Sequence, residues 1–287
     1  MIAPEMGEGF KVKLRGFNSQ KLNAFCVHLW SQTFPRDSIV VFGKLAAIGL
    51  QPRHIEPLRK RGILVGLDFL DFPLGKIDPH LFDFYISSSL SGIAPCKAYL
   101  ESQGRRDPVV EYLPHHHDQR LSSLHIPKRT TFSCCYFGSP KEVHVPESLA
   151  DSISMMDVLN TKDFEDTLPK LGDFAMHYSI RPPAASPEPE RQIYKPFTKG
   201  ITAAACRANI VAPRGFDDAE ELLGPDYPFL VDPTSDASVI AGFEFAKDAF
   251  GGPQWAEGLD MMEALKASVS PGALAQRFRD IIAHVRG

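Results

Sequence analysis

The chain has 287 residues, of which 44% are hydrophobic and 23% charged, and its formal net charge is −4. This composition is typical of a globular protein, and no apolar run reaches the ~20 residues that a membrane-spanning helix needs. The acidic balance argues against nucleic-acid binding, since proteins that bind the phosphate backbone usually carry a basic surplus.

The N-terminal half predicts short strands that alternate with helices. Strands are expected at residues 10–14, 38–42, 63–67, 82–87 and 109–113, and helices at 22–30 and 55–61. The strands are apolar without alternation and are separated by helix-length stretches. That pattern indicates a parallel sheet covered on both faces.

The same pattern restarts after residue 127. Strands are expected at residues 131–137, 156–159, 174–180, 209–212 and 229–231, helices at 148–155, 198–206, 219–223, 237–249 and 273–285, and a loop at 184–191. Two consecutive α/β series predict an α/β fold of two Rossmann-like domains with parallel sheets and a facing cleft. The predicted domains are 1–127 and 128–287, with the last helix crossing back to the first.

The five cysteines form no CxxC pair, and Cys134 and Cys135 lie inside an apolar run. Glu5 and Glu8 stand among the first residues, where a secretory signal would carry a basic segment followed by an apolar one. These features predict reduced thiols and a cytoplasmic protein.

The segment that best indicates chemistry reads YKPFTKGITAAACRANIVA and runs from Tyr194 to Ala212. In it, a polar and cationic loop enters a helix of small residues, and a buried strand follows. A helix N-terminus presents free N–H groups and a partial positive charge. Because Lys195, Lys199 and the Thr198 hydroxyl add donors there, the segment predicts a diphosphate site.

This segment resembles the donor-binding signature of retaining GT-B glycosyltransferases. That signature reads Lys-Pro, a polar stretch, a small-residue helix and a Gly-x-Pro-Val-Ile turn. Here Ala208 and Asn209 replace the Gly and Pro of that turn. One version of the signature also carries two glutamates separated by seven residues (Glu-x7-Glu), and in this chain Thr202 and its neighbours stand in the region of the second glutamate. Residues 173–178 and 212–231 also look like this domain type, so the similarity covers roughly a third of the chain.

The resemblance implies a GT-B architecture, with an acceptor-side domain at 1–127 and a nucleotide-sugar-binding domain at 128–287. It implies a metal-independent, hexosyltransferase-like enzyme without a cofactor. Such an enzyme moves a sugar from a nucleotide-diphosphate sugar to the hydroxyl of a glycan, a lipid-linked acceptor or a small molecule, in glycan or polysaccharide synthesis. Two alternatives stay open, namely a sugar-nucleotide epimerase of similar architecture and a non-catalytic sugar- or nucleotide-binding protein.

The donor-binding residues expected from this reasoning have cationic, hydroxyl or carboxylate side chains. Lysines and Arg181 would hold phosphate, and a glutamate would hold the nucleoside. The full set is Lys195, Thr198, Lys199, Thr202, Arg181, Glu220 and Glu221.

Two further residues follow predicted strands and are candidate general bases, Asp68 and His116. A competing interpretation of Asp68 is a helix cap. His116 belongs to the run 115–118, in which adjacent imidazoles point in different directions, so we predict no metal site. The basic segment 53–61 leaves a peripheral membrane contact open, and no nucleic-acid partner is expected.

Overall fold

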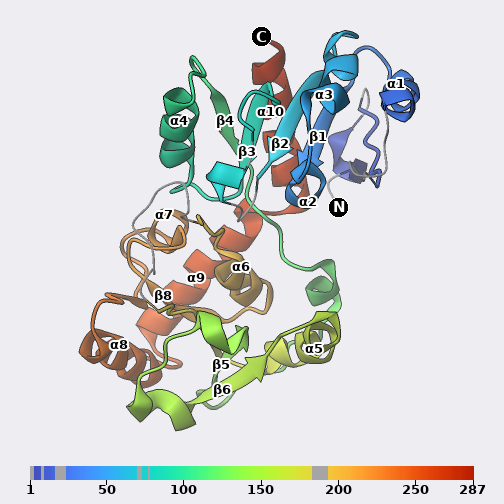
Figure 1. Ribbon diagram of the computed structural model, residues 1–287. Coiled ribbons are helices and arrows are strands. Elements are labelled where there is room, and N and C mark those ends of the chain that lie inside the picture. Colours follow the sequence, from blue (N-terminus) through green and yellow to red (C-terminus); the bar gives the residue numbers. More distant parts are fainter. Residues whose placement is uncertain (1–2, 8–9, 17–23, 70–72, 77, 183–192) are drawn as a thin grey trace. The chain divides into compact units, whose positions relative to one another are not determined.

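The computed structural model describes residues 3–7, 10–16, 24–69, 73–76, 78–182 and 193–287 (Figure 1). Unit 1 comprises Met1–Pro114, Ser186–Pro196 and Leu274–Gly287, and unit 2 comprises His115–Ala185 and Phe197–Ala273. The chain therefore enters unit 2 before the predicted boundary at residue 127, because Leu121 is buried in the core of unit 2. The loop predicted at 184–191 lies outside the described residues.

Unit 1 contains one parallel sheet in the order β1-β2-β3-β4. Its strands are β1 (Ile39–Gly43), β2 (Leu64–Asp68), β3 (Phe84–Ser87) and β4 (Val109–Tyr112). The strand expected at 10–14 is wrong. Residues 10–16 form no strand, and the apolar side chains of Phe10, Val12 and Leu14 are exposed, so no packing stabilises an extended pair there.

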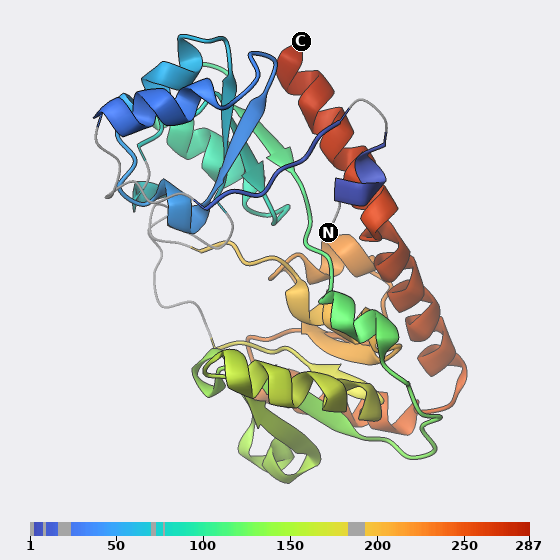
Figure 2. The same ribbon diagram turned by 90° about the vertical axis from the view of Figure 1, so that its right-hand side faces the viewer.

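The helices of unit 1 cover both faces of this sheet with apolar side chains. Ile281 of the terminal helix packs on Phe84 and Ile86 of β3, and His284 Nδ1 lies 2.6 Å from Glu111 Oε1 of β4. The C-terminal part of this helix, red in Figure 2, lies beside the sheet of unit 1. The helices are α1 (Ala24–Gln32), α2 (Lys44–Ala47), α3 (Pro52–Arg59), α4 (Ile93–Ser102) and α10 (Pro271–Arg286), with 3-10 turns at Ala3–Met6 and Leu74–Lys76.

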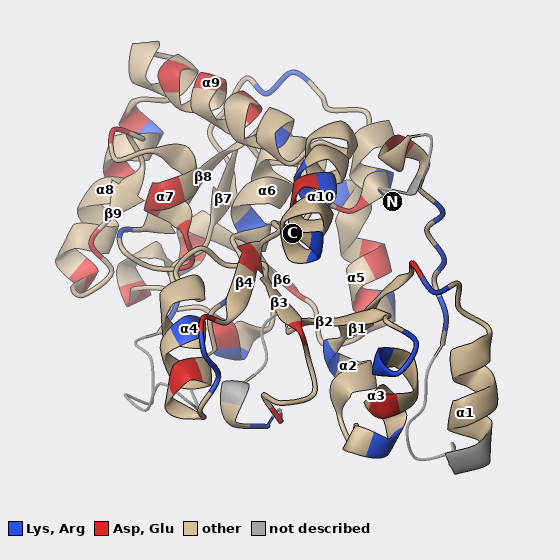
Figure 3. Ribbon diagram, turned by 90° about the horizontal axis from the view of Figure 1, so that it is seen from above, with Lys and Arg blue, Asp and Glu red and all other residues tan. Residues whose placement is uncertain are grey.

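The basic segment 53–61 is partly engaged within unit 1. His54 is fully buried, and Arg59 pairs with Asp83 at 2.8 Å. Figure 3 shows that α3 also carries an acidic residue, which is Glu56. Separately, no helix in the described ranges is both long and apolar enough to cross a membrane.

Unit 2 contains a parallel sheet in the order β6-β5-β7-β8-β9. Its strands are β5 (Cys134–Gly138), β6 (Ile153–Asp157), β7 (Met176–Tyr178), β8 (Asn209–Pro213) and β9 (Leu230–Val231). The helix expected at 148–155 is wrong. Glu147–Ser152 is a 3-10 helix and the next residues form β6, an edge strand that leaves Ser154 and Met155 exposed.

Helices α6 and α9 pack against each other on this sheet (Figure 1). Small residues permit the close approach of α9 to β8, since a Cβ at Gly258 would lie 2.6 Å from Asn209 Oδ1. The helices of unit 2 are α5 (Thr161–Thr167), α6 (Thr198–Ala205), α7 (Ala219–Leu223), α8 (Asp236–Asp248) and α9 (Pro253–Ser268), with 3-10 helices also at Gln119–Ser123, Pro140–Glu142 and Leu168–Asp173.

Candidate functional site

The strand order of unit 2 reverses between β5 and β7, because β6 pairs with one edge of β5 and β7 with the other. In doubly wound sheets, ligands bind beyond the carboxyl ends of the strands at such a switch point. Here β5 ends at Gly138 and β7 at Tyr178. The residues beyond these two ends therefore form the candidate site.

The last residue of β5 is Gly138, which has no side chain. Its φ of +139° lies in the region that favours glycine, and a Cβ there would lie 2.9 Å from Tyr136 Oη. The Tyr136 hydroxyl in turn donates to the Ser139 carbonyl at 2.8 Å. Burial, together with the Glu142 carboxylate, raises the pKa of Tyr136 to about 12, so this hydroxyl stays protonated. The absence of a Cβ at Gly138 therefore leaves room for the Tyr136 hydroxyl at the end of β5.

Lys199 brings a cation to this place from the first turn of α6. Its Nζ lies 5.1 Å from the centroid of the Tyr136 ring, and it would lie 3.5 Å from a Cβ at Gly138. A Lys over an aromatic face is held by the ring quadrupole. This places the Lys199 ammonium beside the end of β5, as an anion site at the switch point requires.

Besides the Lys199 ammonium, the N-terminus of α6 offers backbone N–H donors to an anion. The N-cap residue Phe197 supplies no side-chain hydrogen bond to the first turn, while Thr198 is exposed. Phe197 itself is buried beneath the turn, where a Cβ at Gly200 would lie 1.9 Å from its ring. The first-turn N–H groups, the Thr198 hydroxyl and Lys199 together suit a phosphate group.

Arg181, which follows β7, is held by two carboxylates. It forms an ion pair with Asp217 and another with Glu142 at 3.4 Å. Asp217 and Asp218 both adopt left-handed backbone conformations, with φ of +55° and +58°. Arg181 thus fastens the loop after β8, and its predicted contact with phosphate stays a prediction.

The other predicted residues of unit 2 lie on α6 and α7. Thr202 is 8% exposed within α6, which leaves little of its hydroxyl at the surface. Glu220 pairs with Arg214 at 3.0 Å, and Glu221 is exposed. Their predicted contacts with the nucleoside also stay predictions.

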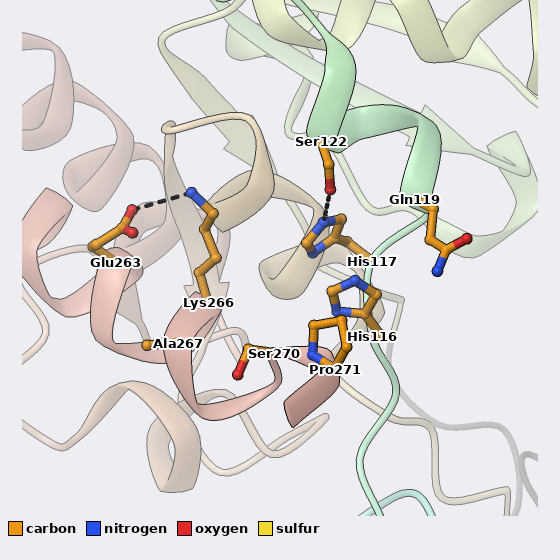
Figure 4. A pocket seen from close by; sticks show the side chains of 9 residues that line it. All are labelled: His116, His117, Gln119, Ser122, Glu263, Lys266, Ala267, Ser270 and Pro271. Carbon is orange, nitrogen blue, oxygen red and sulfur yellow. Dashed lines mark hydrogen bonds and ion pairs between the residues drawn. The ribbon is translucent and has the colours of Figure 1, made fainter. Parts of the chain in front are cut away.

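His116 lies in a pocket of unit 2 of about 480 Å³, which none of the residues above lines (Figure 4). Its Nδ1 donates to the carbonyl of Val269 at 2.8 Å, while His117 Nε2 lies 2.9 Å from Ser122 Oγ. Burial lowers the pKa of His116. Burial also lowers the pKa of His117 to about 4, and the charges of His116 and Lys266 contribute to this shift in the same direction. Both imidazoles are therefore neutral at pH 7.

Metal ligation is not indicated by this pocket. Within the part of the chain that the structure describes, no group of three or more His, Cys, Asp or Glu residues is placed to hold a metal ion.

Asp68 and Lys195 belong to unit 1, where both lie near the carboxyl edge of the sheet. Asp68 ends β2, in register with Gly43 of β1 and Ile86 of β3. Tyr194, the neighbour of Lys195, packs on Gly92 so closely that a Cβ there would lie 2.9 Å from Tyr194 Cβ and 3.2 Å from the Oγ of Ser87, the last residue of β3. The nine predicted site residues are thus divided, with seven in unit 2 and these two in unit 1.

Sequence reasoning did not name Tyr136, Gly138, Glu142 or Asp217 as site residues. One signal was available, since a Gly-Ser pair directly after a buried strand of an α/β series marks the position where ligands bind. The partners of Tyr136 and Arg181 come from distant parts of the chain, and nothing in the spacing indicates them.

Solved structures of glycosyltransferases share this fold. HepE from Anabaena, solved in complex with UDP, has 10% sequence identity and a TM-score of 0.60 over 90% of this chain and 82% of its own. An α,α-trehalose-phosphate synthase (UDP-forming) from Burkholderia xenovorans, in complex with glucose-6-phosphate, has 9% identity and a TM-score of 0.59 over 94% and 78%. Sucrose-phosphate synthase from Thermosynechococcus elongatus has 12% identity and a TM-score of 0.57 over 92% and 77%.

No protein-family model and no curated protein sequence matches the chain. The two parallel α/β sheets and the structural likeness define a protein of the GT-B fold, which confirms the predicted fold class. At identities near 10%, the likeness shows the fold, and the activity has to be argued from the site.

Proposed function

We propose that the chain is a glycosyltransferase that moves a sugar from a nucleotide-diphosphate sugar to an acceptor hydroxyl. The observation that carries this proposal is the Lys199 ammonium beside Gly138, at the β5/β7 switch point and at the start of α6. The fold supports it, because the neighbours of this fold include a protein in complex with UDP and UDP-forming synthases.

The proposed reaction breaks the bond between the anomeric carbon and the diphosphate and forms a bond to the acceptor oxygen, which loses its proton. Negative charge develops on the departing diphosphate. Lys199 and the first-turn N–H groups of α6 are placed to stabilise that charge before the reaction begins. The exposed Thr198 hydroxyl adds a donor, and Lys195 is proposed as a second cation.

Two residues are proposed to take the acceptor proton, and they are alternatives. His116 is neutral at pH 7, which a base requires, because burial lowers its pKa. Asp68 ends β2 in unit 1, where a carboxylate at the carboxyl edge suits an acceptor hydroxyl. Glucose-6-phosphate in one neighbour supports a hydroxylated sugar as the acceptor class. Buried free thiols at Cys134 and Cys135 fit a cytoplasmic setting.

The test is release of nucleoside diphosphate from a panel of UDP- and GDP-sugars, with and without sugar acceptors. Lys199→Ala should lower kcat about 10²- to 10³-fold, which is the usual cost of removing one donor to a developing anion. Lys247→Ala on α8 is the matched control, because this lysine is an exposed partner of Glu244.

The alternatives give different products. An epimerase would convert the sugar without releasing nucleoside diphosphate, and a binding protein would be stabilised by nucleoside diphosphate without turnover. Equal rates for Lys199→Ala and Lys247→Ala would refute the placement of the diphosphate.

A further inference from the structure

A second pocket of unit 2, of about 600 Å³, lies at the opposite edge of the sheet from Gly138. Its lining includes Thr130, Ala175 and Arg207, which precede β5, β7 and β8 respectively. It therefore lies at the amino ends of the strands, whereas the diphosphate site proposed above lies at the carboxyl ends. The pocket belongs to neither the donor site nor the pocket of His116.

The lining of this pocket is cationic and apolar. The charged residues among the described part of its lining are Lys128, Arg129 and Arg207, and none of these described lining residues is acidic. Its apolar side is formed by Phe250, Trp255 and Leu259, and the rings of Phe250 and Trp255 meet edge to face with centroids 4.9 Å apart. A pocket of this size with one apolar wall and a few charged groups suits a small-molecule ligand.

Arg129 has a structural role in this lining. Its guanidinium donates to the carbonyls of Gly172, Cys206 and Arg207 at 2.7, 2.6 and 2.6 Å. These acceptors include the C-terminal end of α6, where a cation offsets the negative end of the helix dipole. The two other cations, Lys128 and Arg207, form no ion pair with a carboxylate within the described ranges. Their charge is therefore available to a ligand.

The backbone of Arg207 gives an independent indication. Its N–H bonds the Ala204 carbonyl at 3.1 Å and the next N–H, of Ala208, bonds the Ala203 carbonyl at 3.0 Å, so α6 ends in a Schellman motif. The residue at this position of the motif is usually glycine, because φ is positive, and at Arg207 φ is +51°. An arginine in this conformation costs backbone free energy, and residues with such strain cluster at ligand-binding and switch regions.

We propose that this pocket binds a phosphate ester with a planar aromatic group, a ligand distinct from the sugar donor. Lys128 and Arg207 hold the phosphate. The half-buried Phe250 and Leu259 receive the ring, and Trp255, which is 6% exposed, lines the pocket beside them. Charge favours such a ligand, because it would neutralise two cations that form no ion pair with a described carboxylate, beside a lining in which the described residues include no acid. The inference is independent of the proposed glycosyltransferase activity.

Trp255 supplies the readout, since the chain has only two tryptophans and Trp30 lies in unit 1. In a Trp30→Phe background, phenyl phosphate should change the Trp255 emission saturably. Lys128→Met and Arg207→Gly should each weaken binding about tenfold, which corresponds to one charge-assisted contact. Arg207→Gly suits the left-handed backbone, so it removes the cation without unfolding the motif.

Lys162→Met on α5 is the charge-matched control and should bind phenyl phosphate as the background does, since Lys162 is exposed and lies outside the pocket. Benzyl alcohol tests the ring without the charge and should bind at least tenfold more weakly. Three results would each overturn the proposal: no saturable change at ~50 mM phenyl phosphate, far above a ~1 mM affinity; equal affinity in the pocket variants and in Lys162→Met; or equal affinity for benzyl alcohol.

Discussion

The imidazole Nδ1 of His116 donates to the carbonyl oxygen of Val269 at 2.8 Å, which ties the segment entering unit 2 to the C-terminal end of α9. Because Nδ1 carries the proton in this bond, the neutral ring keeps its lone pair on Nε2. His116 thus has both a structural bond and an atom that can accept a proton.

This double role makes a comparison of two substitutions informative. His116→Asn retains a side-chain donor for the Val269 carbonyl but has no basic nitrogen, whereas His116→Ala loses both. If His116 is the general base, both variants should lose kcat about 10²-fold or more. Measured melting temperatures should fall only for His116→Ala. A His116→Asn enzyme with wild-type kcat would leave the base role to Asp68.

Gly138→Ala should damage both stability and donor binding. The added methyl would lie 2.9 Å from Tyr136 Oη at a φ of +139°, so we expect a loss of about 1–3 kcal/mol in the free energy of unfolding. Denaturant titration measures the loss. The Tyr136→Phe/Gly138→Ala pair should recover part of it, because the contacting oxygen is gone. The absence of any recovery would show that the cost is wholly in the backbone.

Arg207→Gly should stabilise the protein, by about 0.5–1 kcal/mol, because it relieves the positive φ at the end of α6. Arg207→Ala is the control, since it removes the same charge and keeps a Cβ in the left-handed conformation. A melting temperature higher for Gly than for Ala is the expected result. Equal melting temperatures would contradict an effect of the backbone.

Unit 2 should lose stability as the pH falls from about 6.5 to about 4. His177 is 1% exposed on β7, and burial lowers its pKa from 6.5 to about 4. The unfolded chain therefore binds the proton first, and the penalty grows through this window to the order of 3 kcal/mol. Thermal unfolding followed from pH 8 to pH 4 should show a shallower decline for His177→Phe than for the unchanged chain. Parallel declines would exclude His177 as the cause.

Local sequence patterns predicted the bounds of those helices and strands that are buried along most of their length. The small-residue helix α6 and the buried strand β8 lie within one residue of their expected bounds, because their apolar residues face the core on all sides. The prediction missed α9, although Trp255, Leu259, Met262 and Leu265 follow helical spacing after Pro253. The Gly251-Gly252-Pro253 break marks the start of that helix, with proline in its first turn.

The candidate site was only partly predictable for a physical reason. Lys199 and Thr198 lie next to each other in the chain, so a motif can indicate them. Tyr136, which lies beneath the Lys199 ammonium, is far from it in sequence and belongs to strand β5, whereas Lys199 belongs to helix α6. Such contacts depend on the order in which strands pair, and no local pattern encodes that order.

The last helix has a consequence for biosynthesis. Ile281 of α10 fills the apolar face of the first sheet against Phe84 and Ile86, although almost two hundred residues separate them in the chain. During translation, the first sheet is therefore made before the helix that covers this face, and its apolar side chains stay exposed until α10 has been synthesised. A chain that ends before α10 would leave this apolar face uncovered and would be prone to aggregate.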